Sequence, residues 1–411
     1  MTFRPVLSLL IVAGAGFQPL VAAPQRFNHG NPTVYEQLML ELVNKARANP
    51  SAEAARLGIG LNDGLAAGTI STAPKEPLAF QSQIIAAGRF HSQWMLDQDI
   101  FNHTGAGGGD GFSRMTDAGY PFSKPYAWGE NIAWGGWTGA LDPLPMTYDL
   151  HDNLFRSKGH RTNICGTGFR QLGIGILEGS FQGYNALMAT QNYAASSAYP
   201  NPWLLGVVYR DADDDGAYDV GEGLSGVTVA LADGSWDAVT SESGGYAMPC
   251  AGSGSLNVTF TGAAIGAPVT RSILRAGLNV KLDLILAPAV PALPEIAIFQ
   301  PTGSSLTAGA SSRSFGSTVR GRIGSTRSFT ITNTGTAALG SLSVSIGGRH
   351  PKDFKIIQPS VTSLAPGKST TFRVTFSPRL KGKRTAILRV NSSDTDENPF
   401  NITVTGQGLA P

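Results

Sequence analysis

Long hydrophobic runs, cysteine and charge are all scarce in this sequence of 411 residues. Beyond the first 23 residues no apolar stretch reaches the roughly 20 residues that a membrane-spanning helix needs. The only two cysteines, Cys165 and Cys250, exclude a disulfide framework; we expect two buried thiols rather than one long-range bridge. Charged residues make up 15% of the chain, and its basic positions are not interleaved with aromatic ones. Nucleic-acid binding is therefore not expected.

Residues 1–23 have the layout of a cleavable secretory signal. An early arginine precedes an apolar stretch that ends at residue 17, and three small residues follow at 21–23. Glycine and proline inside the stretch make a buried helix the weaker alternative. We therefore predict a secreted protein without a transmembrane segment. No sorting motif or apolar tail follows Gly408, so we expect no covalent or membrane anchor.

Charge changes in steps along the chain, which suggests separate modules. Residues 1–202 hold 13 basic and 14 acidic side chains, residues 203–292 hold 4 and 10, and residues 293–411 hold 14 and 5. The basic last segment could touch acidic surface polymers, although a solvated basic face explains it more simply. The 51 glycines and 25 prolines favour β-rich modules over a helical bundle.

Hydrophobic periodicity predicts a multidomain protein, an α+β module followed by two all-β sandwiches. In residues 31–197 we predict helices after Asn31-Pro32, over about 77–98 and over about 145–156, with strands at 171–177 and 185–193. Short strands predict a β-sandwich over residues 203–288 and a second, of immunoglobulin-like size, over residues 295–411. Residues 289–294 form a proline-rich linker between the two sandwiches.

His103, Glu130 and His160 form the most site-like set of the first module. We place all three on loops or element ends, where functional side chains are often held. Two neutral imidazoles and a carboxylate are sufficient for Zn²⁺ with an open water position, which could hold a hydroxide for hydrolysis. Without metal, the set could be an acid–base pair or a network around a ligand cleft. We expect His91 to be a packing histidine, and leave His151 open between core and site.

Four segments of this module together resemble the CAP superfamily of cysteine-rich secretory, antigen-5 and pathogenesis-related proteins, in its cysteine-poor bacterial form. They are residues 42–50, 101–105, 129–133 and 159–164, and they occur in family order. The resemblance covers about residues 35–195. It implies an α-β-α sandwich whose central cleft holds two histidines and acidic residues, here His103, His160 and Glu130.

The family's second cleft glutamate has no match in this chain. By register Ser157 falls near its place, where a polar residue closing a helix is a simpler explanation than a nucleophile. Asp149, His151 or Asp152 could replace the missing acid. Because this departure weakens any two-carboxylate mechanism, we favour a binding cleft over catalysis.

Residues 211–222, DADDDGAYDVGE, have the spacing of an EF-hand Ca²⁺ loop. Glycine stands at position 6, and strands rather than helices are expected on both sides. The alternative, an exposed acidic turn, leaves five carboxylates at ligand spacing unexplained. The predicted oxygen ligands are those of Asp211, Asp213, Asp215, Ala217, Asp219 and Glu222.

The two β modules also resemble known families. Residues 204–287 resemble the SdrD-type B repeats of bacterial surface proteins, which implies a calcium-stiffened spacer. Residues 329–335, 364–367, 374–378 and 404–408 resemble the choice-of-anchor D or Hydin-type immunoglobulin-like module, which usually serves adhesion or presentation.

Taken together, these features predict a secreted, monomeric bacterial CAP-domain protein that presents a metal- or ligand-binding cleft on two β spacers. A lipid, a sterol or cell-wall or cell-surface material is the candidate ligand. One alternative is a metal-assisted extracellular hydrolase of peptide or cell-wall material. The other is a structural adhesin with a vestigial cleft.

Overall fold

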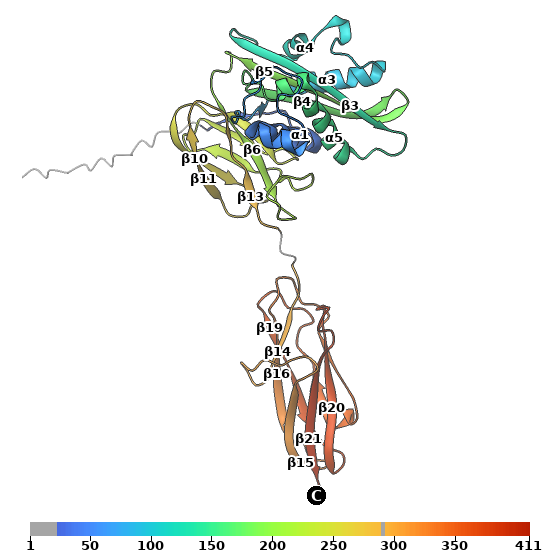
Figure 1. The fold of residues 1–411 in the computed structure, drawn as a ribbon. Helices are drawn as coiled ribbons and strands as arrows, with labels where there is room; N and C mark the ends of the chain where they lie inside the picture. The colour runs from blue at the N-terminus through green and yellow to red at the C-terminus, as the bar shows by residue number, and fades with distance from the viewer. Residues whose placement is uncertain (1–22, 289–291) are drawn as a thin grey trace, which may run out of the picture. The chain divides into compact units, whose positions relative to one another are not determined.

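The computed structural model describes residues 23–288 and 292–411, and their contacts divide the chain into two compact units, residues 1–289 and 290–411 (Figure 1). The predicted secretory signal, except for its last residue, and positions 289–291 of the predicted linker lie outside the described residues. No helix in the described part of the chain is both long and apolar enough to cross a membrane. The observed elements confirm the predicted fold class, an α+β part followed by β-sandwiches.

The α+β part is built on a four-stranded sheet with the order β2-β4-β5-β3. β2 runs parallel to β4, and the other neighbours are antiparallel. This order leaves β3 at one edge of the sheet, with β5 as its only partner. The bounds of the strands are Ala79–Phe80 for β2, Tyr126–Trp137 for β3, Gln171–Phe181 for β4 and Tyr184–Ser196 for β5.

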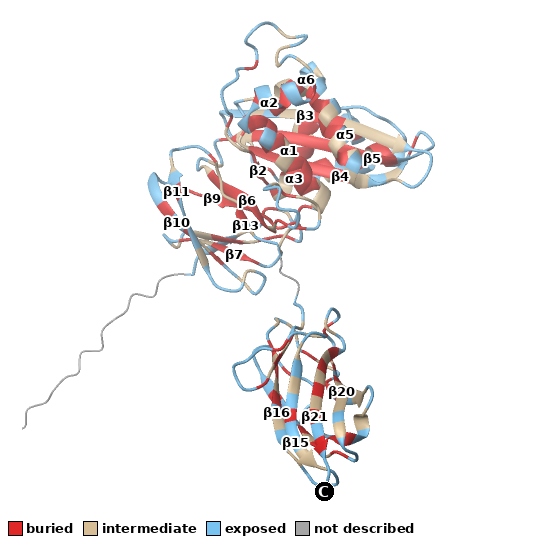
Figure 2. Ribbon diagram, turned by 60° about the horizontal axis from the view of Figure 1, so that its bottom comes forward, coloured by how far each residue is buried: buried red, intermediate tan, exposed pale blue. Residues whose placement is uncertain are grey.

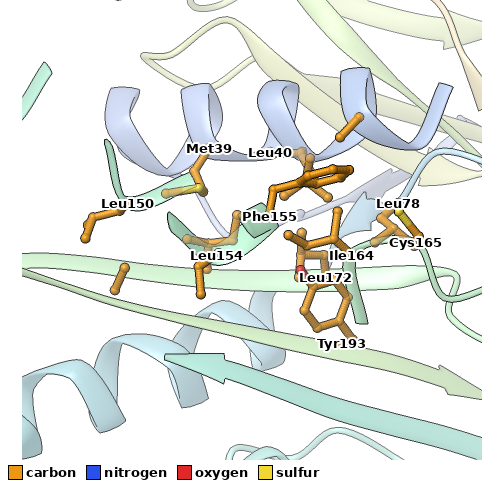
Figure 3. Packing of buried hydrophobic residues seen from close by; sticks show 14 of the residues in the cluster. Met39, Leu40, Leu78, Leu150, Leu154, Phe155, Ile164, Cys165, Leu172 and Tyr193 are labelled. Carbon is orange, nitrogen blue, oxygen red and sulfur yellow. The ribbon is translucent and has the colours of Figure 1, made fainter. Parts of the chain in front are cut away.

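Helices cover both faces of this sheet, because β4 alternates between large apolar residues and glycine. Leu172 and Ile174 pack with α1 (Val34–Ala48), α5 (Pro143–Arg156) and α6 (Lys158–Ile164) in a core shown in Figure 3. Gly173 and Gly175 face α3 (Ser82–Gln98) instead. A Cβ at Gly173 would lie 2.1 Å from the α3 backbone, so glycine permits the close approach of helix and strand. Buried residues accordingly concentrate on α1, β4 and β5 (Figure 2).

Two helix starts differ from the sequence prediction. α1 begins after Thr33 rather than at Asn31-Pro32, because Thr33 and Glu36 form a capping box. The helix predicted from residue 77 begins at Ser82, since the residues before it form β2 and pair with β4. The short helices α2 (Pro50–Arg56) and α4 (Gly111–Asp117) complete this part of the unit.

The remainder of the first unit is a β-sandwich of two sheets. One sheet has the strand order β1-β8-β7-β10-β11, and in the other β6 pairs with β9, β12 and β13. β1 comes from the start of the described chain and pairs in parallel with β8. Phe27 of β1 packs against Trp203 and Trp236, with ring centroids 5.0 and 6.1 Å apart. The strands are β1 Gln25–Phe27, β6 Trp203–Arg210, β7 Thr228–Leu231, β8 Trp236–Val239, β9 Gly245–Pro249, β10 Gly254–Thr261, β11 Val269–Arg275, β12 Val280–Lys281 and β13 Leu284–Leu286.

Buried polar contacts join this sandwich to the α+β part. The side-chain nitrogen of Asn279 donates to the carbonyls of Pro77 and Arg170 at 2.9 and 2.8 Å, and its side-chain oxygen accepts from the backbone N–H of Trp203. Lys281 forms an ion pair with Glu41 of α1 at 2.9 Å. The two parts therefore pack as one unit. Both cysteines are free and buried, and burial raises the pKa of each thiol.

The second unit is a sandwich of two four-stranded sheets, β14-β16-β19-β18 and β15-β21-β20-β17. Its core lies between the sheets, where Phe329 and Phe372 stack with ring centroids 4.9 Å apart. The strands are β14 Ile296–Phe299, β15 Ser312–Val319, β16 Thr326–Asn333, β17 Ser343–Gly347, β18 Phe354–Ile357, β19 Ser369–Phe376, β20 Gly382–Asn391 and β21 Phe400–Leu409.

Candidate functional site

Glu130 lies within β3, the edge strand of the α+β sheet. Its place inside the strand contradicts the prediction that Glu130 lies on a loop or at the end of an element. Residues 126–137 pair continuously with β5, and Glu130 stands opposite Asn192. Because side chains alternate across a strand, Glu130 and Asn131 point to opposite faces of the sheet. At an edge strand, side chains from both helical layers can meet beside the same backbone.

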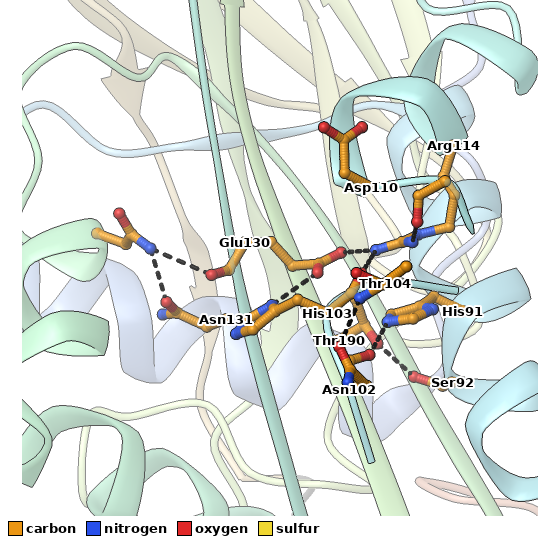
Figure 4. A network of polar contacts seen from close by, with 12 residues as sticks. His91, Ser92, Asn102, His103, Thr104, Asp110, Arg114, Glu130, Asn131 and Thr190 are labelled. Carbon is orange, nitrogen blue, oxygen red and sulfur yellow. Dashed lines mark hydrogen bonds and ion pairs between the residues drawn. The ribbon is translucent and has the colours of Figure 1, made fainter. Parts of the chain in front are cut away.

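The Glu130 carboxylate is buried, and both of its oxygens have partners (Figure 4). Oε1 lies 2.9 Å from Nδ1 of His103, and Oε2 forms an ion pair with Arg114 of α4. With its amide nitrogen turned toward the carboxylate, Asn192 also donates to Oε2, at 3.0 Å. These partners matter because an unpaired buried charge costs several kcal/mol. The contact fixes the half-exposed His103 ring, with Nε2 on the side away from Glu130.

The loop that carries His103 is held by α3 and α4. Arg114 donates to the backbone carbonyl of His103 at 3.1 Å, and His91 of α3 donates to the carbonyl of Asn102 at 3.0 Å. The buried His91 ring also stacks on Trp94. Burial, assisted by the charge of Arg114, lowers the pKa of His91 to about 4. His91 is thus the packing histidine that we expected, and it supports the site from behind.

His160 reaches the same edge from α6, in the opposite helical layer. Asn131 donates to the backbone carbonyl of His160 at 3.3 Å, and Asn163 donates to that of Glu130 at 3.2 Å, so α6 is tied to β3. Burial and the nearby His103 lower the pKa of His160. His103 and Glu130 are therefore in contact, and the first turn of α6 places His160 beside the same strand edge.

This trio does not belong to the tight groups of potential metal ligands found among the described residues, in which all ligand atoms lie within 4.8 Å of one another. Glu130 is already engaged by His103 and Arg114. The arrangement thus offers two imidazoles, one of them oriented by a carboxylate. Ligating histidines commonly use their second nitrogen in this way.

The residues considered as replacements for the missing acid lie elsewhere. His151 is buried, and its Nε2 lies 3.0 Å from Oε1 of Glu53. Arg56 forms ion pairs with both Glu53 and Asp152. Burial opposes ionisation of Glu53, but the hydrogen bonds from His151 and Arg56 prevail and lower its pKa to about 2. His151 and Asp152 therefore serve a structural cluster that ties α5 to α2.

Asp149 and Ser157 do not supply the acid either. Asp149 lines a separate hollow together with Trp137 and Met146. Ser157 ends α5 and begins α6, as expected of a polar residue that closes a helix. Two residues that do touch the Glu130 carboxylate, Arg114 and Asn192, were missed by the sequence analysis. Neither belongs to a recognisable motif. The only available signal was general: a buried carboxylate needs a positively charged partner, which Arg114 supplies.

The acidic loop at residues 211–222 lies between β6 and β7 and has no flanking helices, as predicted. Carboxylate oxygens of Asp211, Asp213 and Glu222 lie within 4.8 Å of one another, as do those of Asp213, Asp215 and Asp219. The two groups share Asp213, so all five predicted carboxylates face one region. Oxygen donors of this number and charge suit Ca²⁺.

Backbone amides hold the two ends of this loop in place. Asp211 accepts from the N–H groups of Asp215 and Gly216 at 3.1 and 2.9 Å. Glu222 accepts from those of Ala212 and Asp219 at 2.6 and 3.0 Å. Gly216, at position 6, has a φ of 75°, which favours glycine at that point of the turn. Positions 1 and 12 are therefore ordered by the chain itself.

Comparison with known families assigns two of the three modules. Residues 40–193 match the model of the cysteine-rich secretory protein family, CAP, and they form a CAP domain. Residues 315–407 match the model of the HYDIN/CFA65/VesB-like, Ig-like domain, and they form an Ig-like domain. Both agree with the resemblances drawn from the sequence. Among curated proteins, none matches the chain.

Three solved structures show the level of similarity. An extracellular protein of Bacillus anthracis strain Ames that contains an SCP domain is 21% identical, with a TM-score of 0.26, over 39% of each chain. The VesB protease of Vibrio cholerae is 18% identical, with a TM-score of 0.21, over 24% of this chain and 30% of its own. A Porphyromonas gingivalis W83 protein of unknown function is 15% identical, with a TM-score of 0.23, over 50% of this chain and 99% of its own. The chain thus spans well under half of the first two proteins.

Proposed function

We propose that this chain, which carries a CAP domain at residues 40–193 and an Ig-like domain at residues 315–407, is a secreted protein whose CAP cleft binds a divalent transition-metal ion such as Zn²⁺. His103 and His160 are the ligands, and Glu130 orients His103. The two β modules act as spacers that present the cleft. The contact between His103 Nδ1 and Glu130 Oε1, at 2.9 Å, is the observation that carries this proposal.

This contact supports metal binding because it fixes the histidine tautomer. A carboxylate that accepts a hydrogen bond from Nδ1–H favours the tautomer in which Nε2 carries the lone pair, and this is the form that binds a metal. The lowered pKa of His160 supports the proposal in the same way, since a neutral imidazole is ready to bind. Arg114 pairs with the other oxygen of Glu130 and so holds the carboxylate in place beside His103. When bound, the cation would polarise a coordinated water or a ligand oxygen.

A binding role agrees better with the geometry than hydrolysis does. A general base needs an oxygen that can reach the attacking water, but Arg114 and His103 engage both oxygens of Glu130. His151 and Asp152, two of the candidate replacements for the missing glutamate, serve the cluster around Glu53 instead. We therefore propose that the cleft binds a metal and a ligand without converting the ligand. Measured turnover of a substrate would change this assignment to an enzyme.

Calorimetric titration of the mature chain with Zn²⁺ tests the proposal. Excess Ca²⁺ is included so that the acidic loop does not compete for zinc. We expect one site in the wild type and at least about a tenfold loss of affinity in His103→Ala and in His160→Ala. His350→Ala, which removes a partly buried imidazole from the second unit, is the control and should bind as the wild type does. Equal zinc affinities in all four proteins would contradict a metal site formed by His103 and His160.

The hydrolytic alternative has its own test. Peptide and cell-wall fragments are incubated with the wild type and with Glu130→Gln, and products are measured. No turnover in either protein agrees with a binding cleft. Turnover that disappears in the folded Glu130→Gln variant would assign catalysis instead.

We also propose that the loop at residues 211–222 binds Ca²⁺ and stiffens the first β-sandwich. The convergence of its five carboxylates, with both ends ordered by backbone amides, supports this role. Without a cation, the six acidic side chains of this short loop repel one another. Bound calcium would offset part of this charge and hold β6 and β7 at a fixed spacing.

A further inference from the structure

A row of aromatic side chains continues along β3 from the candidate site. Glu130, Trp128 and Tyr126 point to the same face of the strand, because side chains alternate with a period of two. Glu130 is buried, whereas Trp128 and Tyr126 are 39% and 41% exposed. At roughly 3.3 Å per residue, the three positions cover about 13 Å of the sheet edge. One strand thus joins the buried Glu130 of the candidate site to exposed rings.

Phe112 of α4 and Phe122 complete this row, which we call the aromatic ledge (Phe112, Phe122, Tyr126 and Trp128). The Phe112 ring centroid lies 4.4 Å from that of Phe122, 5.5 Å from that of Tyr126 and 6.2 Å from that of Trp128. The rings of Phe122 and Tyr126 are 5.4 Å apart. Each ring contacts another, so a ligand would meet a largely pre-ordered surface, which lowers the entropic cost of binding.

The ledge is continuous with the candidate site. Gly111, the residue before Phe112, lies so close to Glu130 that a Cβ added there would stand 3.1 Å from Oε2. A ligand lying along the ledge would therefore contact the exposed rings of Tyr126 and Trp128 and have the half-exposed His103 side chain at its end. The ledge is also open to solvent, unlike a pocket that encloses an apolar molecule.

We propose that the aromatic ledge binds an extended β-1,4-linked pyranose chain, whose end reaches the cleft. Such a chain has flat C–H faces, which stack on aromatic rings, and hydroxyl edges, which suit the polar side chains of the cleft. A sterol or an acyl chain lacks those polar edges and needs a site that covers most of its surface. This inference adds a ligand class to the proposed metal-binding cleft. Only the end of the sugar chain at the cleft depends on the proposed function; binding along the aromatic ledge does not.

Binding of cellohexaose and chitohexaose to the mature chain tests this inference by calorimetry. We expect wild type to bind at least one hexaose, and Trp128→Ala and Tyr126→Ala each to weaken that binding by about tenfold through loss of a stacking surface. Two controls come from the same sheet but lie outside the ledge. They are Trp137→Ala and Tyr184→Ala, whose side chains are 63% and 41% exposed, and they should bind within twofold of the wild type.

Three results would overturn the inference: no binding of either hexaose, equal losses in ledge and control variants, or capture of phosphatidylcholine vesicles through the ledge in place of the sugars. Circular dichroism establishes that each variant is folded. Zinc titration of the same variants separates this inference from the proposed function. Ledge variants that no longer bind the sugar but still bind zinc support both proposals. If the wild type binds the sugar but not zinc, only the sugar-binding proposal stands.

Discussion

The Tyr148 hydroxyl, on α5 of the CAP domain, donates a hydrogen bond of 3.2 Å to Oδ1 of Asp219, at position 9 of the acidic loop. Burial and the negative charge of Asp219 raise the pKa of Tyr148 to about 12, so the hydroxyl remains a donor. The proposed calcium loop is therefore in direct contact with the domain that carries the cleft. Because the two parts pack in one unit, calcium should stabilise the CAP domain as well as the sandwich.

Calcium is expected to raise the melting temperature of the first unit by roughly 5 °C at one hundred times its dissociation constant, where binding adds about 2.7 kcal/mol. All six tryptophans lie in this unit, so their fluorescence reports on it alone. Asp213→Asn, which removes a carboxylate shared by both ligand groups, should abolish the shift. Asp214→Asn, at the neighbouring non-ligand position, is the matched control. A shift that survives in Asp213→Asn would contradict a calcium loop.

Asn279→Ala should destabilise the first unit by about 2 kcal/mol, because the buried N–H of Trp203 and the partly buried carbonyl of Pro77 would each lose a partner, whereas the carbonyl of Arg170 keeps its hydrogen bond from Ala79. The exposed Asn257→Ala on β10 should change stability by less than about 0.5 kcal/mol. Urea unfolding followed by tryptophan fluorescence measures both. Equal small effects would mean that the sandwich and the CAP domain are not held together by this side chain.

Stability of the first unit should fall as the pH drops from about 6.5 toward 4.5. Burial lowers the pKa of His29 to about 4, and burial with the charge of Arg114 does the same for His91. Between those values and 6.5 the unfolded chain binds protons that the folded chain does not, so acid favours unfolding. Each histidine contributes up to roughly 3 kcal/mol across the whole interval.

The free energy of unfolding, measured in urea at pH 7.0, 5.5 and 4.5, checks this dependence. In His29→Gln the decline should be shallower, because one of the histidines with a lowered pKa is gone. A wild type whose free energy of unfolding is constant over this range would contradict the assignment.

Arg114→Met should cost about 3 kcal/mol or more, because it leaves the Glu130 carboxylate buried without its positive partner. Arg156→Met, which removes an exposed arginine at the end of α5, is the control and should be nearly neutral. In the double variant Arg114→Met/Glu130→Gln part of the loss should return, since the unpaired charge is removed. If the double variant is no more stable than Arg114→Met, the cost lies in packing rather than in charge. Thermal unfolding of the four proteins gives these comparisons.

Much of the fold and site could be predicted where the signal is local. The spacing of acids in residues 211–222 depends on one short loop, and the motifs around His103 and His160 are short and contiguous. The conformation of Glu130 could not be predicted in this way. Residues 126–137 contain three glycines and suggested a loop, yet pairing with β5 makes them a strand, because sheet formation depends on the partner.

Contacts between segments far apart in the sequence were the other feature that could not be predicted. Arg114 belongs to no motif, and its pairing with Glu130 depends on how α4 docks beside β3. β1 has only three residues and pairs with β8, more than 200 residues away in sequence. Such pairings carry no periodic signal within one window of sequence. Likewise, the sequence could not show that His151 is no replacement for the missing cleft glutamate. Its contact with Glu53, from another helix, shows this.

The side-chain ¹⁵N resonances of histidine, followed by NMR while Zn²⁺ is added to the calcium-loaded mature chain, test the central claim most directly. We predict that Nε2 of His103 and one ring nitrogen of His160 shift together and saturate at one equivalent of zinc, while Nδ1 of His103 remains protonated against Glu130. The resonances of the buried His29 and His91 should not move at that point. Saturation without any change at His103 and His160 would contradict a metal site at the edge of β3.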